Sequence, residues 1–276
     1  MDRPELEKIL SLHERWLENL PGGRRASIKG ELLKDLELDR FEFKRADLRE
    51  VRFEGSSLVS ADFQGADLSN SDFRGTNLKD AVFFDAKLER ADFRGAEING
   101  VDFHHANLKM AKMSDLVFEN VNLLEAILSK TSLSGSDLRK VNMENVDLSE
   151  ADLLGCDLSG ANLREANFVS TNVDGCKFKG AYLYNTNFLK TDLSGMDFSG
   201  TDLQEANFVN VKLVEAKFKG SNMKDSNFVN VDMRGADFTD ADLEESNFVS
   251  SDLRDAIFEN TNLRGKNWVK CKTDQQ

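Results

Sequence analysis

The sequence is poor in the residues that bend or cross-link a chain. It contains only 2 prolines and 3 cysteines among 276 residues. Three cysteines in a chain of this length do not indicate a disulfide framework. No apolar run is long enough to span a membrane, and no charged-then-apolar leader opens the chain. We therefore expect a cytoplasmic protein that does not use a membrane.

The aromatic residues are almost all of one kind. There are 20 phenylalanines but only 2 tyrosines and 2 tryptophans. A buried Tyr or Trp needs a hydrogen-bond partner for its hydroxyl or indole N–H, whereas Phe needs none. This composition predicts a dry and regular interior.

The sequence instead has a repeat of five residues. A large apolar residue, here called the centre, recurs every five residues from Phe43 to Trp268 without an insertion, and more weakly back to Ile28. A small residue usually stands two positions before the centre, and Asp or Asn stands directly before it. A period of five is neither the 3.6 of a helix nor the 2 of a flat strand. Each unit must therefore turn a corner after a short extended piece.

Four such corners close one coil of twenty residues. This explains why the motif "NFV" returns every twenty residues, at Asn207 and again at Asn227. Stacked coils would pair as parallel strands at a spacing of roughly 4.8 Å. The length of the repeat predicts about twelve coils.

The repeat pattern A(D/N)LXX, as in "ADFQGADLSNSDFRGTNL", resembles the pentapeptide-repeat family. The resemblance covers about residues 26–270. It implies an all-β fold, a right-handed quadrilateral parallel β-helix. Repeat proteins of this kind are solenoids in which each unit contacts its neighbours.

The ends of the repeat predict separate segments. Residues 1–25 are expected to form a capping helix and turn, residues 26–270 the β-helix, and residues 271–276 a short tail. A helix over 4–20, ended by the Pro-Gly-Gly that begins at Pro21, would cover the first coil. Its apolar residues at helical spacing are Leu6, Ile9, Leu10, Trp16, Leu17 and Leu20.

The β-helix itself changes along the chain. Phenylalanine centres dominate coils 41–110 and 166–270, on different pairs of sides, and leucine centres dominate the segment 111–165 between them. Two interpretations remain open: two modules joined by a softer waist, or drift of the repeat with compensated packing. Bulky Leu116 and Val121 at the small position predict a bend or local widening at 111–128.

One side of the C-terminal coils carries two rows of identical or similar residues. The residue after the centre forms an aliphatic ladder, a candidate partner-binding surface. Directly before the centre runs an asparagine ladder, whose stacked amides can hydrogen-bond to one another. The alternative is that β-branched residues simply suit a strand. The aliphatic ladder is Val169, Leu189, Val209, Val229, Val249 and Val269; the asparagine ladder is Asn167, Asn187, Asn207, Asn227, Asn247 and Asn267.

The C-terminal end and the cysteines suggest further contacts. Trp268 and Val269 form the last unit, and an end-to-end contact through them would close the open edge in a homodimer. Cys156 and Cys176 occupy the small inward position one coil apart and are expected to be buried free thiols. Cys271 lies in the tail.

The chain is acidic, with 49 Asp and Glu against 36 Lys and Arg and a net charge of −13. Much of this excess is Asp directly before a centre, where the repeat itself places Asp or Asn. A negative surface steers towards basic partners. Direct DNA or RNA binding is not expected, because it needs a basic footprint.

These observations favour a non-enzymatic, rod-shaped scaffold that binds a protein partner through a flat side. The repeat offers no cleft and no grouped nucleophile and base, so we expect no catalysis and no cofactor. His104 and His105 fall just outside a centre, and no metal site is expected. The alternative follows from the resemblance: some pentapeptide-repeat proteins mimic duplex DNA and bind type II topoisomerase (DNA gyrase), inhibiting it or protecting it from drugs. The mixed charges at 41–55 weaken that alternative.

Overall fold

The computed structural model describes residues 1–274 and contains two compact units, Met1–Leu133 and Ser134–Gln276. The last two residues of the predicted tail, 275–276, lie outside the described residues. The boundary between the units falls within the predicted leucine-rich segment, 111–165. The division into phenylalanine-rich and leucine-rich modules stays a prediction.

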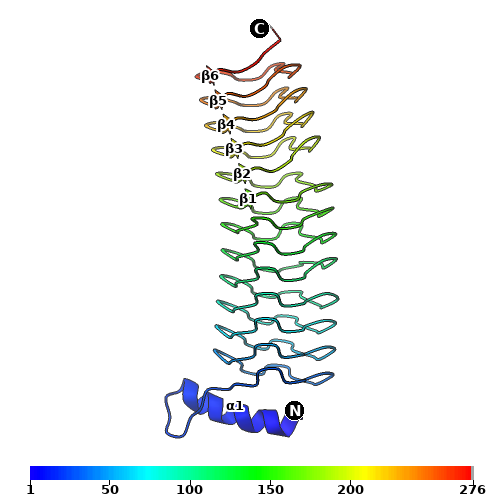
Figure 1. Ribbon diagram of the computed structural model, residues 1–276, viewed down its shortest axis with the longest axis vertical. Helices are drawn as coiled ribbons and strands as arrows, with labels where there is room; N and C mark the ends of the chain where they lie inside the picture. The colour runs from blue at the N-terminus through cyan, green and yellow to red at the C-terminus, as the bar shows by residue number, and fades with distance from the viewer. Residues whose placement is uncertain (275–276) are drawn as a thin grey trace. The chain divides into compact units, whose positions relative to one another are not determined.

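A single helix, α1 (Arg3–Leu17), opens the first unit and lies against the end of its first coils (Figure 1). The side chain of Asp2 caps the helix by accepting a hydrogen bond from the N–H of Glu5 at 2.9 Å. The helix ends earlier than the predicted 4–20, because Asn19 adopts a left-handed backbone with φ 57°. Leu20, predicted to pack, is 46 % exposed beyond the helix.

His13 anchors α1 to the coils. Its side chain is fully buried. Its Nδ1 accepts a hydrogen bond from the backbone N–H of Ala26 at 3.1 Å, so its Nε2 carries the hydrogen donated to the carbonyl of Lys44 at 2.7 Å. Burial lowers the pKa of His13 from its ordinary value of 6.5, which favours this neutral form. The sequence predicted no role for this residue, although its buried side chain makes the polar contact between α1 and the coils.

The turn after α1 depends on a close backbone approach. A Cβ atom at Gly23 would lie 2.4 Å from the backbone nitrogen of Trp16. Only glycine fits there without moving the helix.

Residues twenty apart pair as parallel bridges through the first unit, from Ser27 with Asp47 to Lys112 with Ser132. The bridges continue through the segment 111–128, where a bend or widening stays a prediction. Because most coils repeat the same pairing, the backbone N–H at most centres donates to a carbonyl of the next coil. Phe53, for example, donates to the carbonyl of Asp72 at 2.8 Å.

Phenylalanine rings fill the interior of the first unit in two columns. Phe43 and Phe63 stack with centroids 4.9 Å apart, and Phe53 and Phe73 stack at 5.1 Å. The two columns meet edge to face, as Phe63 and Phe73 do at an interplanar angle of 85°. This is the dry interior predicted from composition, close-packed by rings from successive coils.

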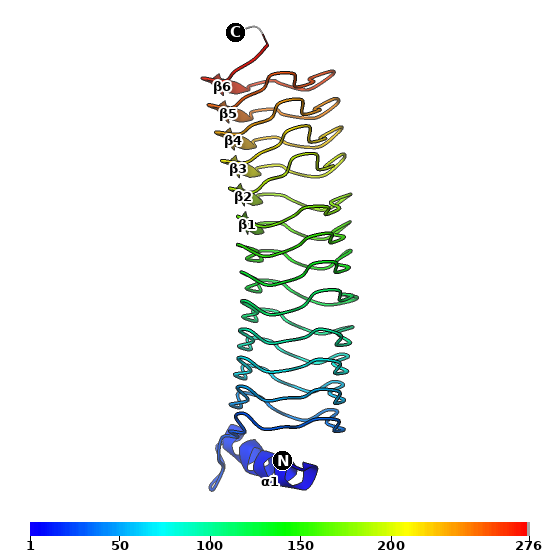
Figure 2. The ribbon, with the colours of Figure 1, turned by 45° about the vertical axis from the view of Figure 1, so that its right-hand side comes forward.

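The second unit contains the regular strands found within residues 1–274. They form one parallel sheet in the order β1-β2-β3-β4-β5-β6, and Figures 1 and 2 show them stacked along one side of this unit. Each strand is a three-residue piece of one coil. The strands are β1 (Asn167–Val169), β2 (Asn187–Leu189), β3 (Asn207–Val209), β4 (Asn227–Val229), β5 (Asn247–Val249) and β6 (Asn267–Val269).

The predicted class, a parallel β-helix of five-residue units with an N-terminal helix, is confirmed. The predicted twelve coils are not all built from regular strands. The regular sheet spans only about five turns, and single bridges at the same twenty-residue spacing hold the other coils. The stacking also continues past residue 270, because Lys272 bridges Asp252.

Polar residues at the small inward position are satisfied within the coils. Thr191 is buried and donates from Oγ1 to the carbonyl oxygen of Phe168 at 2.6 Å. Thr171 makes the equivalent bond to Leu148 at 2.8 Å. Such bonds offset the cost of removing hydroxyl groups from water and let them lie in an apolar interior. No helix in the described part of the chain is long and apolar enough to cross a membrane.

Candidate functional site

The outer face of the β1–β6 sheet carries both predicted ladders. In β1 to β5 the middle residue is buried, and the two flanking residues are half-buried and point outward. The parallel register pairs Asn207 with Asn227 and Val209 with Val229, so like residues stack on like residues. The twenty-residue repeat therefore becomes two straight rows on one face.

The asparagine ladder is a continuous chain of hydrogen bonds. Each Nδ2 donates to the Oδ1 of the asparagine one coil earlier. The chain ends on Asp147, whose Oδ1 accepts from Asn167 at 3.3 Å. The distances are 3.0 Å from Asn187 to Asn167, 3.0 Å from Asn207 to Asn187, 2.8 Å from Asn227 to Asn207, 2.8 Å from Asn247 to Asn227 and 2.9 Å from Asn267 to Asn247.

The aliphatic ladder lies beside it and is less exposed than expected. Val169, Leu189, Val209, Val229 and Val249 are half-buried, and Val269 is 39 % exposed. Neighbouring side chains in the ladder cover one another, because the coils stack at the spacing of paired strands. The ladder is therefore a smooth apolar strip rather than a row of separate protruding side chains.

A shallow groove borders this strip at the corner that follows the strands. Its volume is about 340 Å³. Asn210 and Asn230 line it, and Nδ2 of Asn230 donates to Oδ1 of Asn210 at 2.7 Å. Charged residues of both signs also line it, Lys212, Asp232 and Lys272 among them. The groove adds polar groups next to the two ladders.

The end of the second unit leaves its inner positions partly open. Phe258, Leu263 and Trp268 are half-buried, whereas Phe238 and Phe248 are fully buried. The indole Nε1 of Trp268 is enclosed without a hydrogen-bond partner among residues 1–274. An enclosed donor without a partner is costly, so this end differs from the satisfied coils before it.

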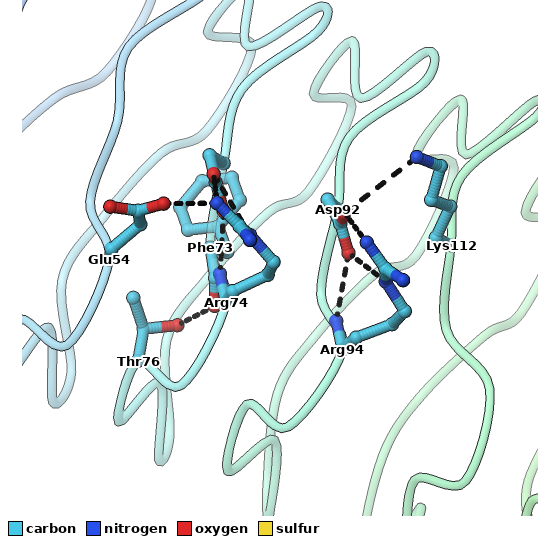
Figure 3. Close-up of polar contacts among 8 residues, drawn as sticks. Glu54, Phe73, Arg74, Thr76, Asp92, Arg94 and Lys112 are labelled. Carbon is cyan, nitrogen blue, oxygen red and sulfur yellow. Dashed lines mark hydrogen bonds and ion pairs between the residues drawn. The ribbon is translucent and has the colours of Figure 1, made fainter.

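Arginines neutralise part of the acidic surface by pairing with an aspartate two residues earlier. Asp232 accepts from the backbone N–H of Arg234 at 3.4 Å and from its Nε and Nη2 at 2.8 Å each. Figure 3 shows the same arrangement at Arg94 and Asp92. The pairs are Asp47–Arg49, Asp72–Arg74, Asp92–Arg94, Asp137–Arg139, Asp232–Arg234 and Asp252–Arg254.

Contacts between coils extend this pairing. In Figure 3 Arg74 also reaches Glu54 of the neighbouring coil, and Lys112 reaches Asp92 at 3.8 Å. The hydrogen bonds from Arg234 hold the pKa of Asp232 below its ordinary value of 3.8. At Asp92 burial alone would raise the pKa, but the bonds from Arg94 outweigh it and the pKa is lowered. These aspartates are thus ionised and locally paired near neutral pH.

Two of the predicted cysteines behave as expected. Cys156 and Cys176 are buried free thiols, and the thiol of Cys176 donates to the carbonyl of Leu153 at 3.0 Å. Cys271, predicted to lie in a tail, is also buried, with its Sγ 3.4 Å from the carbonyl oxygen of Phe248. It fills the small inward position of one further unit.

His104, His105 and Glu125 form a cluster that the sequence analysis missed. Their possible ligand atoms all lie within 4.8 Å of one another. Both histidines were placed just outside a centre, and Glu125 was not considered with them. The signal was present in the register, because His105 and Glu125 are twenty residues apart and must stack.

Family models match most of the repeat. A model of the pentapeptide repeat region matches residues 32–103, 151–228 and 183–248. A model of pentapeptide repeats in 8 copies matches residues 111–145. No curated protein matches this chain.

Solved structures of pentapeptide repeat proteins are similar as well. HetL, involved in heterocyst differentiation regulation in the cyanobacterium Nostoc sp. strain PCC 7120, is 21 % identical over 92 % of each chain, with a TM-score of 0.29. QnrB1, a plasmid-mediated fluoroquinolone resistance protein, is 19 % identical over 88 % of this chain and 93 % of that chain, with a TM-score of 0.30. A pentapeptide repeat protein of the Arabidopsis thaliana thylakoid lumen is 27 % identical over 43 % of this chain and 69 % of that chain, with a TM-score of 0.19.

The matched residues make up well over half of the sequence. They coincide with the coils whose five-residue units and twenty-residue bridges are described above. The chain belongs to the pentapeptide-repeat family.

Proposed function

We propose that this protein is a non-enzymatic scaffold that binds a protein partner through the outer face of the β1–β6 sheet. The observation that carries the proposal is the pair of uninterrupted ladders, one of hydrogen-bonded amides and one of aliphatic side chains. On the same side of earlier coils the position after the centre holds polar or charged residues, such as Arg49 and Glu89. A contiguous apolar strip of this kind is typical of an interaction surface.

The two ladders also define the chemistry of the partner. Both consist entirely of uncharged residues, in a chain with a net charge of −13. The partner surface should therefore be apolar along the aliphatic ladder and should offer hydrogen-bonding groups to the asparagine ladder. The six aliphatic side chains are too few for a standard interface of about 800 Å² per partner. The groove beside Asn210 and Asn230 supplies adjoining surface.

The test compares proteins captured by three purified baits. They are the wild type, a Val209→Lys/Val229→Lys variant in the ladder, and a Val117→Lys control, in which Val117 is 59 % exposed in the first unit. We expect one protein to be retained by the wild type and the control at raised salt, and to be lost by the ladder variant. Circular dichroism establishes that all three fold. An identical set of proteins on all three baits would show that the ladder is only part of the scaffold.

The second candidate function is mimicry of duplex DNA towards DNA gyrase. Its support is the net charge of −13 together with aspartates that recur in register, such as Asp47 below Asp67. The arginine pairs at Asp47 and Asp72 reduce the free negative charge that such a mimic would present. A gyrase supercoiling assay with and without a fluoroquinolone tests it. Inhibition or protection at micromolar protein that disappears at raised salt would favour mimicry, and no effect would exclude it.

The open end at Trp268 and Val269 supports a homodimer through the C-terminal coil. Association would cover the half-buried Phe258 and Leu263. Sedimentation velocity over a concentration series measures this, comparing wild type with Val269→Lys. We expect the wild type to dimerise and the variant to stay monomeric. Equal sedimentation of the two proteins would contradict the proposed contact.

A further inference from the structure

A corner of the first unit groups two imidazoles and a carboxylate. Nε2 of His105 lies 3.0 Å from Oε2 of Glu125. The ring centroids of His104 and His105 lie 4.3 Å apart, and the two rings are almost perpendicular, with an interplanar angle of 82°. One possible ligand atom from each of the three residues falls within 4.8 Å of the other two.

The coils hold this corner in place from below and above. His105 turns the chain with a positive φ of 59°, and its backbone N–H donates to the carbonyl of Leu124 at 3.0 Å. The carbonyl of His104 accepts from the N–H of Asp85 at 3.1 Å. Because Glu125 follows Leu124 at the equivalent turn of the next coil, its side chain stands beside that of His105.

The backbone of His104 and the two imidazole rings make further contacts. The backbone N–H of His104 donates to Oδ1 of Asp102 at 3.1 Å, and the same oxygen accepts from Asn122 at 3.0 Å. The ring of Phe84, one coil earlier, lies 5.3 Å from the ring of His104 and 5.7 Å from that of His105.

The donor set fits one class of ligand. Two imidazole nitrogens and one carboxylate oxygen are a familiar set for zinc, with bonds of about 2.0–2.1 Å and tetrahedral geometry. Tetrahedral ligand atoms then lie about 3.3 Å apart. His105 and Glu125 are already at 3.0 Å, and their side chains are 44 % and 43 % exposed, so rotation can bring the third ligand in. Hard cations such as Mg²⁺ prefer oxygen ligands only.

We propose that His104, His105 and Glu125 bind one divalent transition-metal ion, Zn²⁺ or a close relative. Three protein ligands leave one coordination position for water or for a group of another molecule. The bound ion would join two successive coils, since the histidines belong to one coil and Glu125 to the next. The proposal does not depend on the partner-binding function of the β1–β6 sheet.

The three histidines of the chain make the test direct. Their imidazole carbon–hydrogen resonances are followed by NMR while ZnCl₂ is added to protein without a histidine tag. We expect the signals of His104 and His105 to shift together and saturate at one ion per chain. The signal of His13, which is buried and hydrogen-bonded at both nitrogens, serves as the internal reference and should not move.

Variants with matched charge changes complete the test. Glu125→Gln should weaken Zn²⁺ binding by more than about tenfold, since even outer-shell partners of a metal are worth that much. Glu245→Gln is the control, because Glu245 is also exposed and occupies the same turn position with the same φ of 56°. It should bind Zn²⁺ as the wild type does, and MgCl₂ should shift no histidine signal. Equal Zn²⁺ affinity of the two variants, equal shifts with Mg²⁺, or no shift at millimolar Zn²⁺ would overturn the proposal.

Discussion

Asn227 donates its amide hydrogen to Oδ1 of Asn207 across 2.8 Å, and Asn207 in turn donates to Asn187 across 3.0 Å. Each interior member of the asparagine ladder is thus bonded on both sides, whereas Asn267 makes a single ladder bond, to Asn247. Amides in such a row polarise one another. Removal of one side chain should therefore lower the free energy of unfolding, and the loss should be larger where more ladder bonds are removed.

Asn207→Ala removes two ladder bonds and Asn267→Ala removes one. With a net value of about 0.5–1.5 kcal/mol per hydrogen bond, the first variant should lose roughly 1–3 kcal/mol of unfolding free energy and the second about half of that. Urea unfolding followed by circular dichroism measures both. Equal stability of the two variants would contradict the expectation that an interior asparagine contributes more than the terminal one, and wild-type stability of both would show that the ladder does not contribute.

The column of small residues after the NFV strands predicts a stabilising substitution. Thr171 and Thr191 donate to carbonyls 23 residues earlier, at 2.8 Å and 2.6 Å, but the next residue in that column is the buried Val211. Val211→Thr has nearly the same shape and should donate to the carbonyl of Phe188. We expect a gain of about 0.5–1 kcal/mol, seen as a higher urea midpoint. Val211→Ala, which adds no donor, is the control, and a midpoint of Val211→Thr below wild type would contradict the bond.

His13 should make stability depend on pH. Its pKa is lowered in the folded protein, so the unfolded chain takes up a proton first as the pH falls below about 6.5. The contribution of this residue is therefore complete above pH 6.5 and declines below it until the folded residue is protonated as well.

Urea midpoints measured from pH 5 to pH 8 test this expectation. The wild type should lose stability towards pH 5 more steeply than His13→Gln, whose side chain cannot be charged. The difference between the two proteins cancels the contribution of the exposed histidines. Parallel curves would mean that His13 is not held neutral by the cap.

Asp232 should contribute to the loss of stability in acid. Hydrogen bonds from Arg234 lower its folded pKa below 3.8, so its stabilisation is present above that value and is lost as the pH falls through the folded pKa. Asp232→Asn should be close to wild type at pH 7, because the ion pair is exposed and Asn can keep the turn bond. Asn262 does so, accepting from the N–H of Arg264 at 3.2 Å.

The measurement is the unfolding midpoint between pH 2 and pH 5. Asp232→Asn should fall less steeply than wild type, and Arg234→Gln should behave in the same way because it removes the other half of the pair. Unchanged acid slopes in both variants would show that the pairing does not perturb the carboxylate.

Most of the fold could be predicted because residues that stack on one another in successive coils are twenty residues apart in the sequence. Phe208 meets Phe228 with centroids 4.9 Å apart, and Asn207 meets Asn227, for no reason beyond their separation of twenty residues. The same rule would have paired His105 with Glu125.

Contacts outside this register could not be predicted in the same way. Lys44 receives the hydrogen bond of His13 across 31 residues, and this depends on how α1 docks on the coils. The end of α1 at Leu17 depends on Asn19 and on the backbone approach of Gly23 to Trp16, and no periodicity describes either. The extent to which Val209 is covered depends on its neighbours in the stack, so exposure was overestimated.

The sequence by itself determined the repeat, the coil length, the columns of phenylalanine and the two ladders. It could do so because a five-residue period closed by four corners leaves one way to bury every centre. The tertiary structure alone decided which ladder residues stay accessible, how His13 is satisfied, and that the side chain of His104 lies within reach of His105 and Glu125. These depend on side-chain directions at corners and at the cap, where distance and angle, rather than periodicity, decide which groups meet.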